Sequence, residues 1–367
     1  MLSHDRYALI LEELRRRGSV QVNRMADTLG VTPMTVRRDL TELAERHLVH
    51  RVRGGAVLPV QPATTELRAG RAMGLTVGMV VPSLDYYYPA VVRAAQAVAG
   101  TAGIRVVLRG SAYGPDASDQ RQVEQLLEAG VSGMLLTPTS EPEERDALLD
   151  WVAHLDIPVV LIERRPASSR ARWARLDSVS TDHQLGAALA VDHLTGLGHR
   201  SIGLLIPRLS PTSNALRDGF WAAVRQDGLD RRRVLCVETD DLPASSTTDA
   251  TLLSRCLDSG VTAMLVHADN QAANVTQAAR ELGVDVPHGL SVVSYDDEFA
   301  GAIDPPLTAV RPPRSALGQI AMELLVARLS RGHKGPPQRI QLVPQLIPRH
   351  STAKPGRRRR GTASRTD

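Results

Sequence analysis

The stretch TPMTVRRDLTELAERHLVHRVRGGA, from Thr32 to Ala56, decides how the first part of this chain folds. Thr32 can accept hydrogen bonds from the free amides of a helix start, and Pro33 fits the first helical position because its missing N–H costs nothing there. Apolar residues then recur with helical spacing and predict one buried face, formed by Val36, Leu40, Leu43 and Ala44. Outside that face lie Met34, Thr35, Arg37 and Arg38. We therefore expect a helix that presents a basic surface to an anionic partner.

Two shorter amphipathic stretches precede this helix. The first ends in three arginines before Gly18, and its apolar face consists of Tyr7, Ile10, Leu11 and Leu14. The second ends at Gly30, and its apolar face consists of Val22, Met25, Ala26 and Leu29. After the third helix, LVHRVRGGAV alternates apolar and basic residues and predicts a two-stranded wing. Residues 1–57 are thus expected to form a winged helix-turn-helix domain.

A basic helix of this kind suits double-stranded DNA, because the major groove admits one α-helix and flanking cations fix its register on the phosphates. Arg37 or Arg38 could pair with a guanine. A solvated helix face is the alternative reading of an arginine pair. The capped helix start, the tight turn and the basic hairpin together favour DNA.

The charge of the chain is unevenly distributed. Its 367 residues carry a net charge of +4. The first 57 residues hold ten Arg against seven Asp and Glu, and the chain from Arg349 onward is also strongly basic, so the segment between them is acidic. A basic head on an acidic body suits a nucleic-acid reader joined to a domain with another task. Residues 351–367 are expected to be a disordered basic tail, either solubilising or making non-specific phosphate contacts.

Several other classes of protein are disfavoured. The sequence has no long apolar stretch and no signal peptide, so we expect a cytoplasmic protein without a membrane partner. Cys236 and Cys256 read as ordinary core residues, and the histidines are scattered without ligand spacing, so no metal is expected. No cofactor motif or catalytic residue stands out, since the adjacent Asp296 and Asp297 would diverge in an extended stretch.

Residues 58–74 contain two prolines and no sustained periodicity, and they predict a linker. From residue 75 to 350, apolar runs of strand length alternate with amphipathic helical stretches. This alternation predicts an α/β body of two doubly wound lobes with parallel sheets. The expected strands are LTVGMVV, IRVVLRG, GMLLT, PVVLIE, RSIGLLI, RVLCVE, TAMLVHA and LSVVSYD.

Polar residues follow many of these strands, where ligands of doubly wound sheets bind. They are Ser83, Asp85, Tyr86 to Tyr88, Arg164, Asp269, Asn270, Asp296 and Asp297. Carboxylates and amides bind hydroxyl groups, and a tyrosine ring can cover the apolar face of a sugar. Each residue alone could instead be a helix cap or turn residue. Their joint placement favours a sugar-like small-molecule effector.

Two resemblances sharpen these expectations. The T-x-R-R-D-L segment and the R-x-x-G-G-A wing make residues 1–57 similar to the heads of DeoR-type bacterial repressors. The resemblance implies that the helix from Thr32 to Glu45 enters the major groove. The DNA contacts it implies are Thr32, Thr35, Arg37 and Arg38 on the helix, with Arg51 and Arg53 on the backbone. Met34 is added as a DNA-binding candidate because it lies outside the buried face. Asp39 is expected to pair with an arginine of the same domain.

The body resembles the effector-binding part of the LacI/GalR regulators, which is periplasmic-binding-protein-like. The resemblance rests on VSTDHQLGAALAVDHLTGLGHRSIGLL, RDGF, GVDVPHGLSVVSYDD, PPLTAVRPP and LIPRHST. It implies two lobes, an effector between them and a homodimer. The chain departs from the family at Asp269-Asn270, which is reversed, at Ser294 in place of glycine, and at Leu216, where Arg217 is displaced by one position. We keep Arg217 as a ligand candidate. The linker also lacks the family's hinge helix.

The resulting expectation is a ligand-responsive transcriptional regulator, a repressor of carbohydrate-related genes. One alternative is a solute-binding protein for transport, which the body alone would allow. Another is a sugar-phosphate enzyme, because heads of the DeoR type usually precede an isomerase-like body.

Overall fold

The computed structural model describes residues 6–7, 9–10, 13, 19–45, 49–52, 55–57, 74–111, 119–139, 142–166, 171–208, 210–239, 250–331 and 335–356. The chain divides into two compact units, Met1–Gly70 and Arg71–Asp367. The expected linker lies outside the described residues up to residue 73, and so does the end of the chain from residue 357.

The first unit is a helical head with a small sheet. Its elements are β1 (Ser19–Gln21), α2 (Val22–Leu29), α3 (Pro33–Glu45), β2 (His50–Val52) and β3 (Gly55–Val57). Residues 6–7, 9–10 and 13 are helical as well. The sheet has the order β1-β3-β2, and both pairings are antiparallel. The predicted two-stranded wing is therefore present, and β1 adds a third strand that the sequence analysis missed. Apolar residues of these elements form one core, including Ile10, Val20, Met25, Val36, Leu40 and Leu43.

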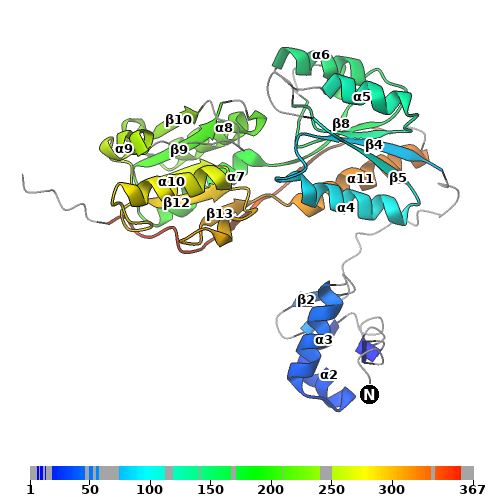
Figure 1. The fold of residues 1–367 in the computed structure, drawn as a ribbon, viewed down its shortest axis with the longest axis horizontal. Coiled ribbons are helices and arrows are strands. Elements are labelled where there is room, and N and C mark those ends of the chain that lie inside the picture. Colours follow the sequence, from blue (N-terminus) through cyan, green and yellow to red (C-terminus); the bar gives the residue numbers. More distant parts are fainter. Residues whose placement is uncertain are drawn as a thin grey trace, which may run out of the picture. The chain divides into compact units, whose positions relative to one another are not determined.

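The second unit contains two lobes, and the N-lobe is built on a six-stranded parallel sheet of order β14-β8-β7-β6-β4-β5. Its strands are β4 (Thr76–Val81), β5 (Arg105–Gly110), β6 (Met134–Leu136), β7 (Val159–Ile162), β8 (Asp177–Thr181) and β14 (Arg339–Leu342). Helices cover both faces, with α5 and α6 on one side and α4 and α11 on the other (Figure 1). They are α4 (Tyr88–Thr101), α5 (Asp119–Glu128), α6 (Pro142–Val152) and α11 (Arg314–Arg331), with the short helix η2 (Ala171–Arg175) before β8.

The C-lobe has a sheet of order β10-β9-β11-β12-β13-β15, in which β15 alone runs antiparallel to its neighbour. Its strands are β9 (Ile202–Pro207), β10 (Leu235–Thr239), β11 (Ala263–His267), β12 (Ser291–Tyr295), β13 (Thr308–Arg311) and β15 (Gln345–Ile347). Its helices are α7 (His183–Gly196), α8 (Pro211–Gln226), α9 (Ala250–Asp258) and α10 (Asp269–Glu281), with η3 (Arg231–Arg233) and η4 (Ala300–Ala302). One apolar core lies under α7 and α8 and another under α9 and α10.

The chain crosses between the lobes three times, after β8, after β13 and after β14 (Figure 1). The N-lobe is thus completed by α11 and β14, which come late in the sequence. Gly318 lets α11 approach α4 closely, because a Cβ at this position would collide with the backbone of Val91. The lobes are therefore not two successive halves of the chain.

The packed part of the body extends beyond the expected end at residue 350. Ser351 is buried, its hydroxyl donates to the carbonyl of Val292 at 2.5 Å, and it accepts from the N–H of Thr308 at 2.8 Å. A Cβ on Gly356 would lie 2.7 Å from the carbonyl oxygen of His288. Residues 351–356 thus pack on the C-lobe, whereas the sequence predicted a disordered tail from residue 351.

Candidate DNA-binding and effector-binding sites

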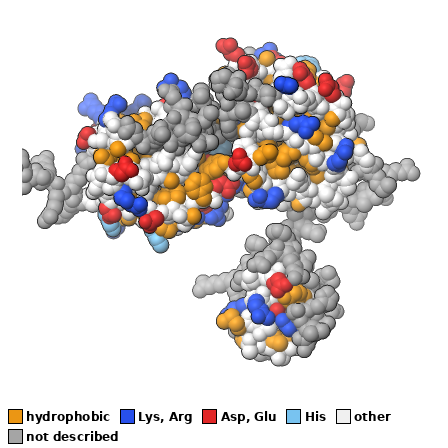
Figure 2. Space-filling view, viewed as in Figure 1, with side chains coloured by type: hydrophobic (Ala, Val, Ile, Leu, Met, Phe, Trp, Pro, Cys, Tyr) orange, Lys and Arg blue, Asp and Glu red, His pale blue; other side chains and the backbone are white. Residues whose placement is uncertain are grey.

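Helix α3 begins as the sequence predicts. The N–H of Thr35 donates to Oγ1 of Thr32 at 3.2 Å, so Thr32 caps the helix. The side chain of Met34 is 68% exposed, and Arg37 and Arg38 are exposed as well. Basic side chains lie close together on the visible face of the head (Figure 2). The residues predicted to contact DNA on this helix therefore occupy its outer face near its start, the part of a recognition helix that reaches base edges.

Asp39 lies on the inner side of the same helix. It is buried and forms a bidentate ion pair with Arg6, with Nε–Oδ2 at 2.7 Å and Nη2–Oδ1 at 2.9 Å. The hydroxyl of Tyr7 donates to Oε2 of Glu42 at 2.5 Å. The prediction that Asp39 pairs with an arginine of its own domain is confirmed. These contacts fix the start of the chain against the recognition helix.

The wing carries the other two predicted DNA contacts, Arg51 and Arg53. In the hairpin of β2 and β3, Arg51 pairs with Ala56. The side chain of Arg51 and the whole of Arg53 lie outside the described residues. Their contacts with the DNA backbone stay a prediction.

Three of the predicted ligand-binding residues meet at the junction of the two lobes. Tyr86 follows β4 of the N-lobe, whereas Asp269 begins α10 and Asp296 follows β12 of the C-lobe. The hydroxyl of Tyr86 donates to Oδ2 of Asp296 at 3.1 Å and accepts from the N–H of Asp269 at 3.3 Å. These partners are 210 and 183 positions apart in the sequence. The carboxyl ends of parallel strands bring them together.

The environment of Asp296 keeps this residue neutral. Burial, together with the negative charge of Asp269, raises the pKa of Asp296 to about 8, although Arg314 and the Tyr86 hydroxyl act to lower it. The Nε2 atom of His267 lies 3.6 Å from Oδ2 of Asp296, and burial lowers the pKa of His267 to about 3. At neutral pH the site thus holds a carboxylic acid beside a neutral imidazole. A protonated carboxyl both donates and accepts, which suits the hydroxyl of an uncharged ligand.

Asp269 itself serves the fold. Its carboxylate accepts from Oγ of Ser294 at 2.5 Å and from the N–H groups of Glu298 and Phe299 at 2.6 and 2.9 Å. These bonds tie the start of α10 to the loop after β12, which carries Asp296. Two departures from the LacI/GalR pattern, Asp269 and Ser294, therefore bond to each other. The carboxylate of Asp269 therefore holds this loop rather than a ligand.

A second polar group at the junction was missed by the sequence analysis. Nε2 of His183 lies 3.1 Å from Oε2 of Glu163, which follows β7 in the N-lobe, and its Nδ1 lies 2.9 Å from the hydroxyl of Tyr295 in the C-lobe. Tyr87 and Thr181 also donate to Glu163. Although burial acts to raise the pKa of Glu163, the charge and hydrogen bond of His183 and these other donors bring it down to about 2. The sequence shows no carboxylate at ligand spacing around His183, because its partners lie 20 and 112 positions away.

Backbone strain is concentrated at this junction. Among the described residues, the non-glycine positions with left-handed φ are Tyr87 (64°), Glu163 (55°), Asp296 (100°) and Asp297 (52°). Such conformations cost about 1 to 3 kcal/mol each and cluster at ligand clamps and switch regions. The strain marks the junction as the candidate effector site independently of the side-chain chemistry.

A cavity of about 690 Å³ lies between the lobes beside this junction. Glu163, Arg164 and Ser180 line it from the N-lobe, and His183 and Asn214 line it from the C-lobe. Oγ of Ser180 is buried and has no hydrogen-bond partner among the described residues. The same holds for three atoms near the carboxyl ends of β6 and β11, namely Thr137 Oγ1, His267 Nδ1 and Gln271 Oε1. Unsatisfied groups of this kind cost about 1 to 3 kcal/mol each, so a polar ligand that pairs with them gains affinity.

Arg164 is the predicted ligand residue that lines this cavity. It is buried, and its guanidinium donates to the carbonyls of Pro138 at 2.9 Å and Glu163 at 2.8 Å. Asp297 is held by ion pairs with Arg311 at 2.6 Å and Arg349 at 2.8 Å. Arg164 therefore stays a ligand candidate, while Asp297 ties together strands of its own lobe.

The other predicted ligand residues have structural contacts of their own. Oγ of Ser83 accepts from the N–H of Asp85 at 3.1 Å and so shapes a turn, as the alternative reading has it, and Asp85 is exposed. Tyr88 is buried in the N-lobe core, with its ring centroid 5.1 Å from that of Tyr87. The side-chain oxygen of Asn270 accepts from the next N–H at 2.9 Å. Arg217 pairs with Glu238 across α8 and β10 at 2.5 Å.

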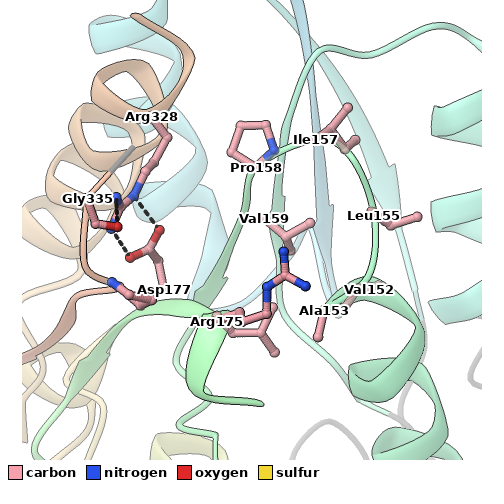
Figure 3. A pocket seen from close by; sticks show the side chains of 12 residues that line it. Val152, Ala153, Leu155, Ile157, Pro158, Val159, Arg175, Asp177, Arg328 and Gly335 are labelled. Carbon is pink, nitrogen blue, oxygen red and sulfur yellow. Dashed lines mark hydrogen bonds and ion pairs between the residues drawn. The ribbon is translucent and has the colours of Figure 1, made fainter. Parts of the chain in front are cut away.

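A smaller cavity of about 260 Å³ lies at the amino ends of the N-lobe strands, where β7 and β8 begin (Figure 3). Ile157, Pro158 and Val159 form an apolar wall, and the facing wall carries the ion pair of Asp177 and Arg328, whose closest approach is 2.7 Å. Arg328 also donates to the carbonyl of Gly335 at 3.2 Å. Arg175 also lines this cavity. Because Asp177 and Arg328 satisfy each other and one wall is apolar, this cavity offers fewer polar partners to a sugar than the one between the lobes.

Within the described ranges, no group of His, Cys, Asp and Glu side chains could hold a metal ion. No helix that the structure describes is long and apolar enough to cross a membrane.

Comparison with known proteins agrees with both units. The model of the DeoR-like helix-turn-helix domain matches residues 6–61, and that of the periplasmic binding protein-like domain matches residues 191–352. The chain is 30% identical over 347 residues to the HTH-type transcriptional regulator reg1 of Streptomyces lividans, covering 92% of this chain and 98% of that protein. It is 30% identical over 283 residues to the ribose operon repressor of Escherichia coli, covering 75% and 82%.

Among solved structures, the lactose repressor bound to the anti-inducer ONPF matches with a TM-score of 0.62 and 26% identity, covering 76% of this chain and 100% of that chain. The chain belongs to the family of HTH-type transcriptional regulators, with a DeoR-like head and a body of the LacI-family fold. The predicted fold class of two doubly wound lobes behind a winged helix-turn-helix head is confirmed.

Proposed function

We propose that this regulator is a cytoplasmic repressor of carbohydrate-related genes, and that a sugar-like effector bound between its lobes changes its affinity for an operator. The observation that carries the proposal is the buried, strained junction around Asp296, whose pKa of about 8 makes it a neutral partner for hydroxyl groups. The printed functions of relatives support it, since one of them is a ribose operon repressor.

The DNA half of the proposal assigns the exposed start of α3 to the major groove. Thr32, Met34, Thr35, Arg37 and Arg38 face the bases and nearby phosphates, and the wing residues Arg51 and Arg53 contact the backbone. Palindromic or repeated operators match a symmetric homodimer, in which two heads reach successive half-sites. The basic charge of the head adds a salt-dependent attraction to any DNA.

The effector half assigns Tyr86, Arg164 and Asp296, together with Glu163 and His183, to the effector site. A ligand shifts regulation only if it binds the DNA-competent and DNA-incompetent forms unequally, with typical couplings of about 1 to 3 kcal/mol. Because the chain crosses between the lobes three times, a change in lobe separation moves α11 and β14 with it. In a dimer such a change alters the distance between the heads.

Thermal unfolding of the full chain with neutral sugars tests the effector half. D-ribose, L-arabinose, D-galactose and maltose are added separately, and the same series is run on Asp296→Ala. A bound sugar stabilises the wild-type body by mass action, by about 2.7 kcal/mol at a concentration 100 times its Kd. A panel without any shift, or an equal shift in Asp296→Ala, contradicts the proposal. Chemical conversion of the added sugar would indicate an enzyme instead.

A further inference from the structure

We propose that, in the ligand-free regulator, the hydroxyl of Tyr86 occupies the position of an effector hydroxyl, so that an effector acts only by displacing this side chain. The inference rests on the proposed function, because it takes Asp296 to be part of the effector site. It makes Tyr86 a determinant of which small molecules the regulator recognises.

The hydrogen bonds of Tyr86 are those that a sugar hydroxyl would make. Its oxygen donates to the carboxyl of Asp296 at 3.1 Å and accepts from the N–H of Asp269 at 3.3 Å. Both partners belong to the C-lobe, whereas Tyr86 belongs to the N-lobe. A single hydroxyl group that donates and accepts thus links the lobes from within the protein. An alcohol of a ligand has the same donor and acceptor capacity.

Tyr86 also covers the buried carboxyl of Asp296. Asp296 is only 4% exposed and is not part of the wall of the 690 Å³ cavity between the lobes. The ring of Tyr86 meets the ring of Phe299 edge-on, with centroids 6.2 Å apart, so the side chain is packed from the C-lobe side as well. A ligand therefore reaches the carboxyl of Asp296 only after Tyr86 has moved.

The turn that carries Tyr86 is built to allow this movement. Leu84 is 51% exposed and Asp85 is exposed, and Tyr86 is only partly buried at the margin of the N-lobe core, so its displacement leaves the buried residues of that core in place. By contrast, the next two tyrosines are buried, and Tyr87 is tied to Glu163 of its own lobe. Displacement can thus be confined to the turn before Tyr87. A ligand must replace both lost hydrogen bonds, which selects neutral polyhydroxyl compounds over apolar ones of the same size.

Calorimetric titration of the full chain tests the inference with the first sugar of the panel (D-ribose, L-arabinose, D-galactose, maltose) that binds the wild type. Tyr86→Phe keeps the ring and removes the competing hydroxyl. We expect this variant to bind that sugar at least about fivefold more tightly, because the two hydrogen bonds of the Tyr86 hydroxyl no longer have to be broken. Tyr87→Phe is the matched control, since its hydroxyl bonds within the N-lobe, and it should not bind more tightly.

Weaker or unchanged binding by Tyr86→Phe overturns the inference, because the hydroxyl would then assist the ligand or be irrelevant to it. Equal tightening in Tyr87→Phe overturns it too. If no sugar of the panel binds the wild type, it is the proposed effector class that fails. The contact of Tyr86 with the C-lobe is then tested without ligand. Spin labels at Glu128 in the N-lobe and Glu281 in the C-lobe report the distance between the lobes, in a protein that also carries Cys236→Ala and Cys256→Ala. A longer, broader distribution in Tyr86→Phe supports the inference, and an unchanged one overturns it.

Discussion

The recognition helix and the lobe junction carry function in opposite ways. On α3 the residues assigned to DNA are exposed apart from Thr35, which is half-buried, while a separate buried face holds the helix in the head. At the junction Glu163 and Asp296 are buried, and both have left-handed backbones. On α3, different residues stabilise the fold and serve function, whereas at the junction the same residues do both. Substitutions on the outer face of α3 should therefore change DNA binding alone, whereas substitutions at the junction should change ligand response and stability together.

The largest effect is expected from Asp39→Ala. Asp39 lies on the buried side of α3, so this substitution should change stability as well as DNA binding. Removing one partner of the buried ion pair with Arg6 should destabilise the head by about 3 to 5 kcal/mol and abolish operator binding. Calorimetric unfolding of the full chain measures this, with the transition of the body as an internal reference. Arg38→Ala is the control on the same helix, and it should alter head stability by no more than about 0.5 kcal/mol. Comparable losses of stability in both variants would refute the division into two faces.

Arg37→Ala should weaken operator binding by about 1 to 3 kcal/mol and relax the preference at one base position if Arg37 reads a guanine. Binding to a set of single-base operator variants, measured at fixed salt, separates the possibilities. Because the side chain is exposed, the unfolding temperature of the head should not change. An equal loss on every sequence would reassign Arg37 to a phosphate contact.

A further prediction tests the comparison at the junction and concerns the pH dependence of stability. The pKa of Asp296 is raised from an ordinary value of 3.8 to about 8 in the folded protein. The unfolded chain therefore releases this proton near pH 4, while the folded chain keeps it until about pH 8, so the stability that Asp296 contributes falls as pH rises between these values. The lowered pKa of His267 acts in the opposite direction below its ordinary value of 6.5, so the comparison is made with a variant. Asp296→Asn should lack this decline. Unfolding temperatures of both proteins from pH 5 to 9 check it, and parallel curves would show that Asp296 is not a protonated buried acid.

Much of the head could be predicted from the sequence, because its decisive signals are local. The cap at Thr32, the spacing of Val36, Leu40 and Leu43 and the pairing of Asp39 lie within the head itself, and the structure confirms them. The three-residue strand β1 was missed because it is too short to show an alternating pattern.

In the body, eight strands were predicted from their apolar runs, but β8, β13, β14 and β15 were not. These strands lie next to the crossings between the lobes, and they read as parts of polar or proline-containing segments. The prediction that polar residues after the strands lie close together is correct for Tyr86 and Asp296. The contact between Glu163 and His183 was not found, because His183 follows β8, the neighbour of β7 in the sheet, and β8 was not among the predicted strands.

The central claim is that the arginines of α3 determine where the regulator binds and that Asp296 determines when. Operator affinity of the full chain, measured by fluorescence anisotropy with and without the sugar that shifts its unfolding, tests this claim most directly. The wild type should change its operator Kd by about 5-fold to 150-fold on adding the sugar. Asp296→Ala should bind the operator as tightly as the ligand-free wild type and should not respond to the sugar. A retained response in Asp296→Ala, or a loss of its ligand-free operator binding, would contradict the account.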